Sequence, residues 1–374
     1  MEFSIDKRDL LRGLNRTHGV AERKGSMPIL SNVLISTQGE DAIRLSATDL
    51  YQGVSAIVPA KILREGQVAV SAKTFFDIAK ALPLGEVSVT VAENKGMTIR
   101  SGKVQYKVPG FSGADFPPLP MPDDAPFFDV PVDHLVELIT LTQYSMSSDD
   151  TRPHLAGTLF EGDGEILRAV TTDGHRLSKA QRTISGAKYQ FSMLVPHKGI
   201  VELRKLLEDI RSADKSGDAT LAVAKAAGNA FFRYDSQSLS VKLADEQFPP
   251  YEKVIPTQHA RRLTANRLIL IEALRRISLV AHDKSGSVQL SLEPGLLRVQ
   301  SQNSEVGEGF EELDIDYDGD PIALGFNARY ILDVLTALTH DEIAIELSRE
   351  LDPGVIKPVG DDIDFVGVVM PMRI

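Results

Sequence analysis

The sequence predicts an α+β protein made of three copies of one domain, each with two helices on antiparallel sheets. A strand followed by a helix is expected three times, at Phe3–Leu14, Phe128–Ile139 and Arg261–Ile277. A second segment of this kind follows each of them, at Val68–Pro83, Phe191–Leu207 and Pro321–Leu338. The first and second copies start 125 residues apart, at Phe3 and Phe128. Solenoid repeats are only about 20–50 residues long, so each copy is a whole domain.

Short apolar runs between these helices, bounded by Gly, Asn and Asp, predict strands. They are Ala42–Ala47, Val87–Val91, Met97–Arg100, Val104–Val108, Leu167–Thr171, Leu239–Leu243, Val288–Leu292 and Leu296–Gln300. Such short strands and turns leave little room for parallel crossovers, so antiparallel sheets with helices on one face are expected. Proline-rich joints near residues 117–126 and 249–258 divide the chain into domains at 1–122, 123–256 and 257–374. Residues 210–217 are expected to form a polar loop.

Composition limits the class of protein. The 374 residues are 43% hydrophobic and 25% charged, as in ordinary globular domains. The chain contains no cysteine, which excludes disulfides and thiolate metal sites. A charged N-terminus and the lack of an apolar run of about 20 residues predict a cytoplasmic protein without a membrane span.

Basic residues recur on the predicted helices although the net charge is −11. Arg8, Arg12 and Arg16 are successive i, i+4 neighbours, opposite the leucines of the same helix. Lys73 with Lys80, Lys198 with Lys205 and Arg267 with Arg275 share helix faces in the same way. The helix at residues 132–146 has no basic residue. These faces are either simple solvated surfaces or a distributed contact for phosphates.

Catalytic motifs are missing. The sequence has no GxxxxGK[ST], GxGxxG, HExxH or GxSxG motif, and its eight histidines never have metal-ligand spacing. The one constellation that resembles an active site is Asp173, His175 and Arg176, where His175 would be a general base. No nucleophile accompanies it.

Several segments resemble one known family. TTDGHRL (Thr171–Leu177) and VVMPMRI (Val368–Ile374) are similar to stretches of the bacterial DNA polymerase III β subunit, the sliding clamp. Further similar stretches occur in order along the whole chain, at PILSNVLI (Pro28–Ile35), FFDIAKALP (Phe75–Pro83), ADFPPLP (Ala114–Pro120), VPHKGIVEL (Val195–Leu203), FPPYEKVIP (Phe248–Pro256) and GFNARYILDVLTAL (Gly325–Leu338).

The resemblance implies a non-catalytic ring, formed by two chains head to tail, that encircles double-stranded DNA and confers processivity on the polymerase. Such a ring slides, so it needs diffuse phosphate contacts and no base readers. The matching basic positions are Arg8, Arg12, Arg16, Lys24, Lys73, Lys80, Arg152, Lys198, Lys205, Arg267 and Arg275. No cofactor and no metal is implied.

The resemblance also implies a pocket between the second and third domains. It would bind short Leu/Phe-containing peptides of the polymerase III catalytic subunit, the clamp loader, other polymerases and repair proteins. The matching positions are Leu155, Thr172, Gly174, His175, Arg176, Leu177, Pro249, Val254, Val368, Met370, Pro371, Met372 and Arg373. Aliphatic and Met side chains suit an adaptable apolar wall, with His175 and Arg176 fixing polar groups of the peptide. Alternatively, Leu155, Leu177, Val254 and Val368 are ordinary core.

Three positions match the dimer interface of the family: Tyr106 on the strand at 104–108, and Leu279 and Val280 at the end of the fifth helix. Lys253 and Pro353-Gly354 depart from the usual pattern and bear on peptide preference. Two other classes stay open on the residues alone. One is an enzyme that uses Asp173, His175 and Arg176, and the other is a protein-interaction scaffold that never meets DNA.

Overall fold

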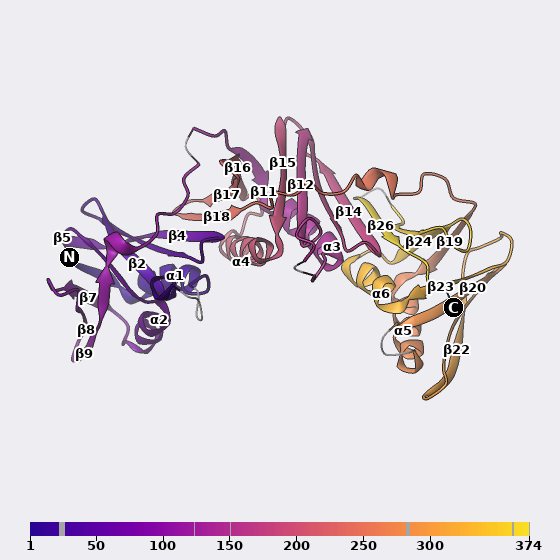
Figure 1. Cartoon of the computed structure of the whole chain (residues 1–374), viewed down its shortest axis with the longest axis horizontal. Helices are drawn as coiled ribbons and strands as arrows, with labels where there is room; N and C mark the ends of the chain where they lie inside the picture. The colour runs from indigo at the N-terminus through magenta and orange to yellow at the C-terminus, as the bar shows by residue number, and fades with distance from the viewer. Residues whose placement is uncertain (22–26, 123, 150, 282–284, 361–362, 374) are drawn as a thin grey trace. The chain divides into compact units, whose positions relative to one another are not determined.

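A computed structural model describes residues 1–21, 27–122, 124–149, 151–281, 285–360 and 363–373 (Figure 1). They form two compact units. The first contains Met1–Val132 and Val201–Leu243, and the second contains Asp133–Ile200 and Ala244–Ile374.

The described residues contain six α-helices, two for each predicted copy of the domain. They are α1 (Lys7–Thr17), α2 (Ala72–Ala81), α3 (Val132–Thr142), α4 (His197–Ala213), α5 (Arg267–Ile277) and α6 (Ala328–Ala337). In α1, α2, α5 and α6 the strand before the helix ends in a polar N-cap residue: Asp6, Ser71, Asn266 and Asn327. Each side-chain oxygen accepts a hydrogen bond from a backbone N–H of the first turn, which satisfies a donor that has no helical partner.

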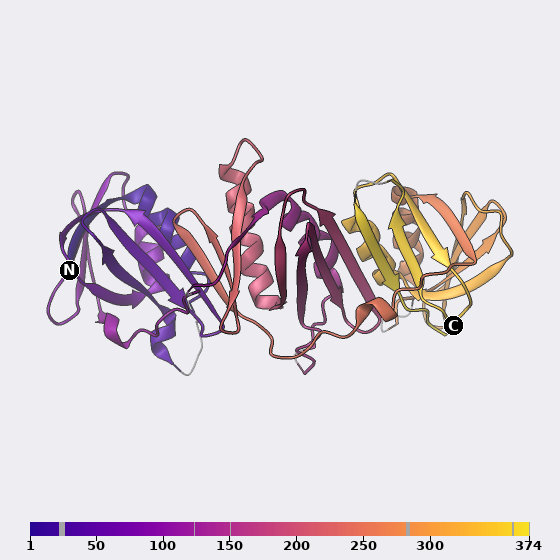
Figure 2. The same cartoon turned by 90° about the horizontal axis from the view of Figure 1, so that it is seen from above.

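The first unit has two antiparallel sheets. The five-stranded sheet has the order β5 (Lys61–Arg64), β1 (Glu2–Asp6), β7 (Glu86–Val91), β8 (Met97–Ser101), β9 (Val104–Val108). The nine-stranded sheet has the order β10 (Gly110–Ser112), β6 (Gln67–Ser71), β2 (Asn32–Gln38), β3 (Ala42–Thr48), β4 (Gln52–Pro59), β18 (Gln237–Lys242), β17 (Asn229–Tyr234), β16 (Thr220–Ala226), β11 (Phe128–Pro131). In Figure 2, violet strands from the first copy of the domain lie beside salmon strands from the second.

The second unit is also built from two antiparallel sheets. The eight-stranded sheet has the order β15 (Tyr189–Pro196), β12 (Gly157–Gly164), β13 (Ile166–Thr172), β14 (Arg176–Thr183), β26 (Asp364–Val369), β25 (Gly354–Pro358), β24 (Glu342–Leu347), β19 (Arg261–Asn266). The four-stranded sheet has the order β22 (Gly307–Asp314), β21 (Leu296–Asn303), β20 (Ser287–Glu293), β23 (Ile322–Asn327).

One strand pair in each long sheet joins consecutive copies of the domain. In the first unit β4 pairs with β18, with Gly53 opposite Ser240. In the second unit β14 pairs with β26, with Leu177 opposite Val368. Backbone hydrogen bonds therefore continue across both joints.

The helices are placed by apolar faces and close backbone approach. Leu10 and Leu14 of α1 are fully buried. A Cβ on Gly13 would lie only 2.6 Å from Leu45 Cδ1, so α1 lies close against β3 there and a larger residue would require the Leu45 side chain to move.

The predicted α+β class with antiparallel sheets is confirmed, and each of the eight predicted strands corresponds to a strand of the structure, although Leu243 lies one residue beyond the end of β18. Three helix ends differ from expectation. The helix expected at 132–146 ends at Thr142 and is followed by a 3₁₀ turn, Gln143–Ser145. Leu279 and Val280 likewise lie in a 3₁₀ turn, Ser278–Val280, after α5. The loop expected at 210–217 was wrong for its first part, because Ile210 is buried and α4 continues to Ala213.

Candidate peptide site and basic helix faces

The turn between β13 and β14 is shaped by its own side chains. Thr172 Oγ1 donates to the Arg176 carbonyl at 2.7 Å. Asp173 Oδ1 accepts the N–H groups of His175 at 2.9 Å and Arg176 at 3.0 Å. Gly174 has a φ of 90°, in the left-handed region that favours glycine. The sequence TTDGHR thus specifies a tight turn with His175 exposed at its tip.

The C-terminal segment runs beside this turn. After β26, the Met370 N–H donates to the His175 carbonyl at 2.9 Å. The Met372 N–H donates to the Gly325 carbonyl at 2.8 Å, which ties the segment to β23. These bonds fix Met370 next to His175, and Met370 stays exposed.

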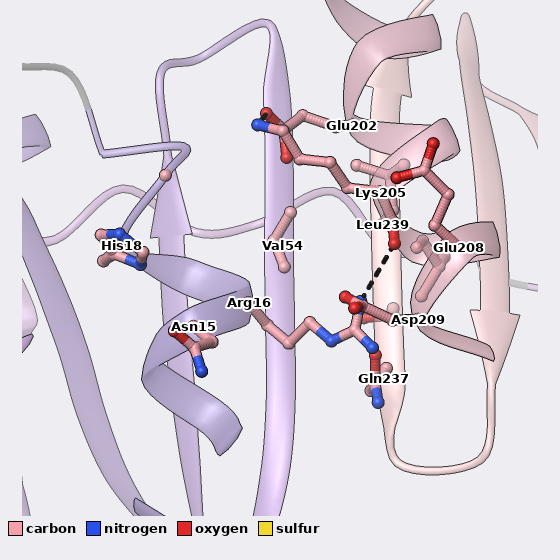
Figure 3. Close-up of a pocket in the computed structure, with 13 residues that line it drawn as sticks. Asn15, Arg16, His18, Val54, Glu202, Lys205, Glu208, Asp209, Gln237 and Leu239 are labelled. Atoms are coloured by element: carbon pink, nitrogen blue, oxygen red, sulfur yellow. Dashed lines mark hydrogen bonds and ion pairs between the residues drawn. The ribbon is translucent and has the colours of Figure 1, made fainter. Parts of the chain in front are cut away.

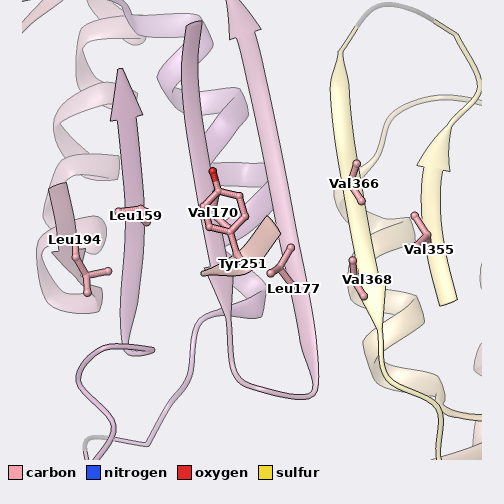
Figure 4. Close-up of a cluster of buried hydrophobic side chains, with 8 residues drawn as sticks. All are labelled: Leu159, Val170, Leu177, Leu194, Tyr251, Val355, Val366 and Val368. Carbon is pink, nitrogen blue, oxygen red and sulfur yellow. The ribbon is translucent and has the colours of Figure 1, made fainter. Parts of the chain in front are cut away.

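The floor of the candidate site is apolar and buried. Leu177 and Val368, which face each other across the ladder, belong to a cluster that also includes Tyr251 and Val355 (Figure 4). Four of the predicted site residues are buried: Leu155, Thr172, Leu177 and Val368. Pro249, Arg176, Pro371 and Met372 are half-buried, whereas Gly174, His175, Val254, Met370 and Arg373 are exposed. Leu155, Leu177 and Val368 thus fit the alternative of ordinary core, whereas Val254 does not.

Tyr251 is fixed on this floor by a polar network. Its hydroxyl donates to Glu161 Oε2 at 2.6 Å, and Arg168 Nη1 donates to both of these oxygens at 3.0 Å. Burial, followed by the hydrogen bond with Glu161, raises the pKa of Tyr251 above its ordinary value. Because the Val254 N–H donates to the Tyr251 carbonyl, the network also positions Val254.

The guanidinium of Arg176 is engaged by groups of the protein itself. Its Nε donates to Asp173 Oδ2 at 3.0 Å, Nη1 to Asp333 Oδ2 at 2.5 Å and Nη2 to the Tyr144 carbonyl at 2.5 Å. The guanidinium also lies 4.5 Å from the centre of the Tyr330 ring. All three nitrogens therefore bind protein groups.

These bonds also bear on the enzymatic alternative. The two carboxylate oxygens of Asp173 accept from the His175 backbone and from Arg176 Nε. The carboxylate thus shapes the turn and is not aimed at the imidazole as the partner of a general base would be.

Arg152 lies near the same turn. Its Nη1 would be 3.8 Å from a Cβ on Gly174, and its Nε donates to Asp149 Oδ2 at 2.9 Å. The hydroxyl and the backbone N–H of Thr151, followed by Arg152, lower the pKa of Asp149. The Leu155 N–H donates to the Arg152 carbonyl, so this loop leads directly into the buried Leu155.

The predicted basic positions fall into three groups. Four are exposed and have no ion-pair partner among the described residues: Arg8, Lys73, Lys80 and Lys198. Four form ion pairs with carboxylates three residues away: Arg12 with Asp9, Arg152 with Asp149, Lys205 with Glu202 and Arg275 with Glu272. Exposed pairs of this kind are weak, so these cations stay available to an anion. Lys24 lies outside the described residues.

Arg16 and Arg267 are engaged by the protein. Arg16 pairs with Asp209 and donates to the Lys205 carbonyl at 3.4 Å, beside a cavity of about 570 Å³ between α1 and α4 (Figure 3). Its side chain is 14% exposed, and burial lowers its pKa. Arg267 donates to the His340 carbonyl at 2.6 Å and the Leu335 carbonyl at 3.2 Å, near the end of α6. The arginine stripe expected on α1 is therefore open at Arg8 and Arg12 only.

The predicted interface residues lie at or near sheet edges. Tyr106 is on β9, which is the last strand of its sheet, and its side chain is exposed. Leu279 is 79% exposed and Val280 is half-buried, and a Cβ on Gly309 of the edge strand β22 would lie 3.4 Å from Val280. Edge strands with exposed apolar side chains are templates for pairing with another chain.

Three residues of the site were not predicted: Tyr144, Tyr330 and Asp333. They surround Arg176, and Tyr330 also lies 6.4 Å from the His175 ring. Nothing in their local sequence indicates this, because they come from two segments nearly 190 residues apart that meet only in the fold. Among the described residues, no group of three or more His, Cys, Asp or Glu is arranged to hold a metal ion. None of the described helices is long and apolar enough to cross a membrane.

Repeated two-helix domains joined by continuous antiparallel ladders, with exposed basic residues on the helices, define a protein of the DNA-clamp class. Comparison with known proteins agrees. Residues 1–120, 129–250 and 252–373 match the models of the N-terminal, central and C-terminal domains of the DNA polymerase III beta subunit.

The similarity to characterised relatives covers whole chains. The beta sliding clamp of Caulobacter vibrioides is 34% identical and that of Escherichia coli K12 is 32% identical, each over 100% of both chains. The crystal structure of the beta subunit from Pseudomonas aeruginosa has a TM-score of 0.93 at 30% identity, again over both full chains. A second structure from that organism, of the clamp bound to griselimycin, has a TM-score of 0.92. The chain belongs to the DNA polymerase III beta subunit family, the bacterial sliding clamps, which are processivity factors and not enzymes.

Proposed function

We propose that two copies of this chain form a head-to-tail ring that encircles duplex DNA without reading its sequence. The exposed Arg8, Lys73, Lys80 and Lys198 on three helices support this, because they supply diffuse positive charge on an otherwise acidic protein. The domains of the ring are residues 1–122, 123–256 and 257–374. The ring closes where the edge that carries Tyr106 meets the partner's edge near Leu279 and Val280. Such a protein works on the chromosome in the cytoplasm.

The ring tethers its partners through the site at the turn between β13 and β14. A buried apolar floor beside the exposed Met370, Val254 and His175 suits a short peptide with Leu and Phe side chains. The partners are the polymerase III catalytic subunit, the clamp loader, other polymerases and repair proteins.

The test of encirclement is retention on circular DNA. The purified protein is loaded onto nicked circles by a cognate clamp loader with ATP, and the circles are then cut. Retention on circles and loss from cut DNA are expected, since only topological linkage depends on the ends. Equal retention on both forms would mean ordinary binding to DNA. Absence of retention, with a loader that loads another clamp, would favour the scaffold alternative.

A further inference from the structure

The guanidinium of Arg176 is a junction between two parts of the second unit. On one side it binds Asp173 in the turn and the carbonyl of Tyr144 after α3. On the other side it binds Asp333 and lies over the ring of Tyr330, both on α6. The first set belongs to the central family domain and the second set to the C-terminal family domain.

These partners cover most of the Arg176 side chain. It is 10% exposed, and its positive charge is paired with the carboxylates of both Asp173 and Asp333. Charge-assisted hydrogen bonds with short N–O distances are stronger than neutral ones. Removing one partner of a buried ion pair strongly lowers the stability of the folded protein. A peptide that bound Arg176 directly would have to displace one of these partners.

The partners of Arg176 also lie next to the exposed residues of the peptide site. Tyr330 packs under Arg176 and lies beside His175, and the His175 carbonyl accepts the Met370 N–H. A shift of α6 away from the turn would thus separate Tyr330 from His175.

We propose that Arg176 is a positioning residue: it locks α6 against the turn between β13 and β14 and so holds the peptide site in its binding shape. The inference rests on the proposed function of that site. It assigns the residue to the joint between the central and C-terminal domains and not to the peptide.

The test is a double-mutant cycle on peptide affinity in the full-length protein. The variants are Arg176→Gln, Asp333→Asn and the double variant, and the probe is a fluorescein-labelled synthetic peptide with a Leu-Phe pair. We expect Arg176→Gln to weaken binding about tenfold and Asp333→Asn to weaken it less. The double variant should bind no worse than Arg176→Gln, because residues that act through one contact are not additive. If Arg176→Gln has no effect, or the same effect in both backgrounds, the proposal is overturned.

Arg176→Lys separates positioning from simple charge. One ammonium group cannot reach acceptors on three segments in the planar arrangement that a guanidinium uses, so Lys should not restore affinity. Restoration by Lys would show that the peptide needs only a positive charge and would overturn the proposal. If Arg176→Gln does not fold, Asp333→Asn decides alone: weaker binding supports positioning and unchanged binding contradicts it. Met370→Ala is the control for the proposed function. Unchanged peptide binding in that variant would show that the peptide does not bind at this site, so the proposed function and the role given to Arg176 would both be wrong.

Discussion

The turn between β3 and β4 and the turn between β13 and β14 have the same backbone and different surroundings. Thr48 Oγ1 donates to the Gln52 carbonyl at 2.8 Å, as Thr172 Oγ1 donates to the Arg176 carbonyl at 2.7 Å. In each turn an Asp accepts two backbone N–H groups through Oδ1. The Thr-Asp pair therefore builds the turn in both copies of the domain.

The side chains on this common backbone differ. Leu50 has a φ of 72°, where the second turn has Gly174. Leu177, on the floor of the candidate peptide site, corresponds to Gly53 in the first copy of the domain. A Cβ on Gly53 would lie 2.6 Å from Leu119 Cδ2. In the first copy of the domain, Leu119 therefore occupies the space that the side chain of Leu177 takes in the second copy.

The strands beside the two turns, β18 and β26, also differ in their side chains. Opposite Gly53 is Ser240, whereas Val368 lies opposite Leu177. The residue whose N–H binds the tip of the turn is Lys242 in the first case and Met370 in the second. The repeated fold thus provides two equivalent joints, and a few side chains distinguish the one that we propose to bind an apolar peptide from the other.

The largest difference between the turns should come from their aspartates. We expect Asp173→Ala to lower the free energy of unfolding by about 3 kcal/mol, because two backbone donors and the buried Arg176 lose an acceptor. Asp49→Ala should cost about 1 kcal/mol, because the N–H groups it leaves are near the surface. Chemical denaturation of the full chain measures both, and equal losses would show that Arg176 adds nothing to the second turn.

Next in size is the effect of the methionine at the second turn. Met370→Ala should weaken binding of a Leu-Phe peptide about tenfold, or about 1.4 kcal/mol, through loss of apolar contact. Lys242→Ala is the matched control and should leave the affinity unchanged. Fluorescence anisotropy with a labelled peptide distinguishes the two, and an effect of Lys242→Ala as large as that of Met370→Ala would place a peptide at the first joint.

A smaller effect is expected from exchanging the residues with positive φ. Gly174→Leu should cost about 1 kcal/mol of stability, since a left-handed conformation is unfavourable for a residue with a Cβ. Leu50→Gly should be nearly neutral, because the relief of about 1 kcal/mol is offset by the conformational entropy of glycine. Thermal unfolding of both variants tests this. A neutral Gly174→Leu would mean that the second turn can adopt another backbone.

The smallest effect concerns pH. Tyr251 of the second domain corresponds to Leu119 of the first, and burial raises its pKa above the ordinary value of 10.0. A raised pKa stabilises the folded state below pH 10, and that stability is lost as the pH rises toward the folded-state value. The unfolding temperature should therefore fall above pH 10 less steeply in Tyr251→Phe than in the unchanged protein. Parallel curves would mean that Tyr251 ionises equally in both states.

The sequence alone predicted much of the fold for a physical reason. Strand alternation and the i, i+4 spacing of arginines opposite leucines are local signals, so Val104–Val108 and the helix after Asp6 could be located without tertiary information. Helix ends were harder to predict. Ile210 extends the apolar face of α4, and that this residue is buried is known only from the tertiary structure. The 3₁₀ turn at Ser278–Val280 has no sequence signal that separates it from α5.

The contacts of the candidate site residues could not be predicted from the sequence alone. A helical wheel places Arg16 on the same stripe as Arg12, yet Asp209, far away in the sequence, engages Arg16. The ion pair of Arg176 with Asp333 on α6 could not be predicted from local sequence for the same reason. Long basic side chains reach partners that sequence spacing does not specify.

Isothermal titration of the full chain with a Leu-Phe peptide tests most directly whether only one of the two equivalent joints binds. One peptide per chain is expected, with its affinity weakened about tenfold in Met370→Ala and unchanged in Lys242→Ala. Two peptides per chain, or binding that depends on Lys242 and not on Met370, would contradict it.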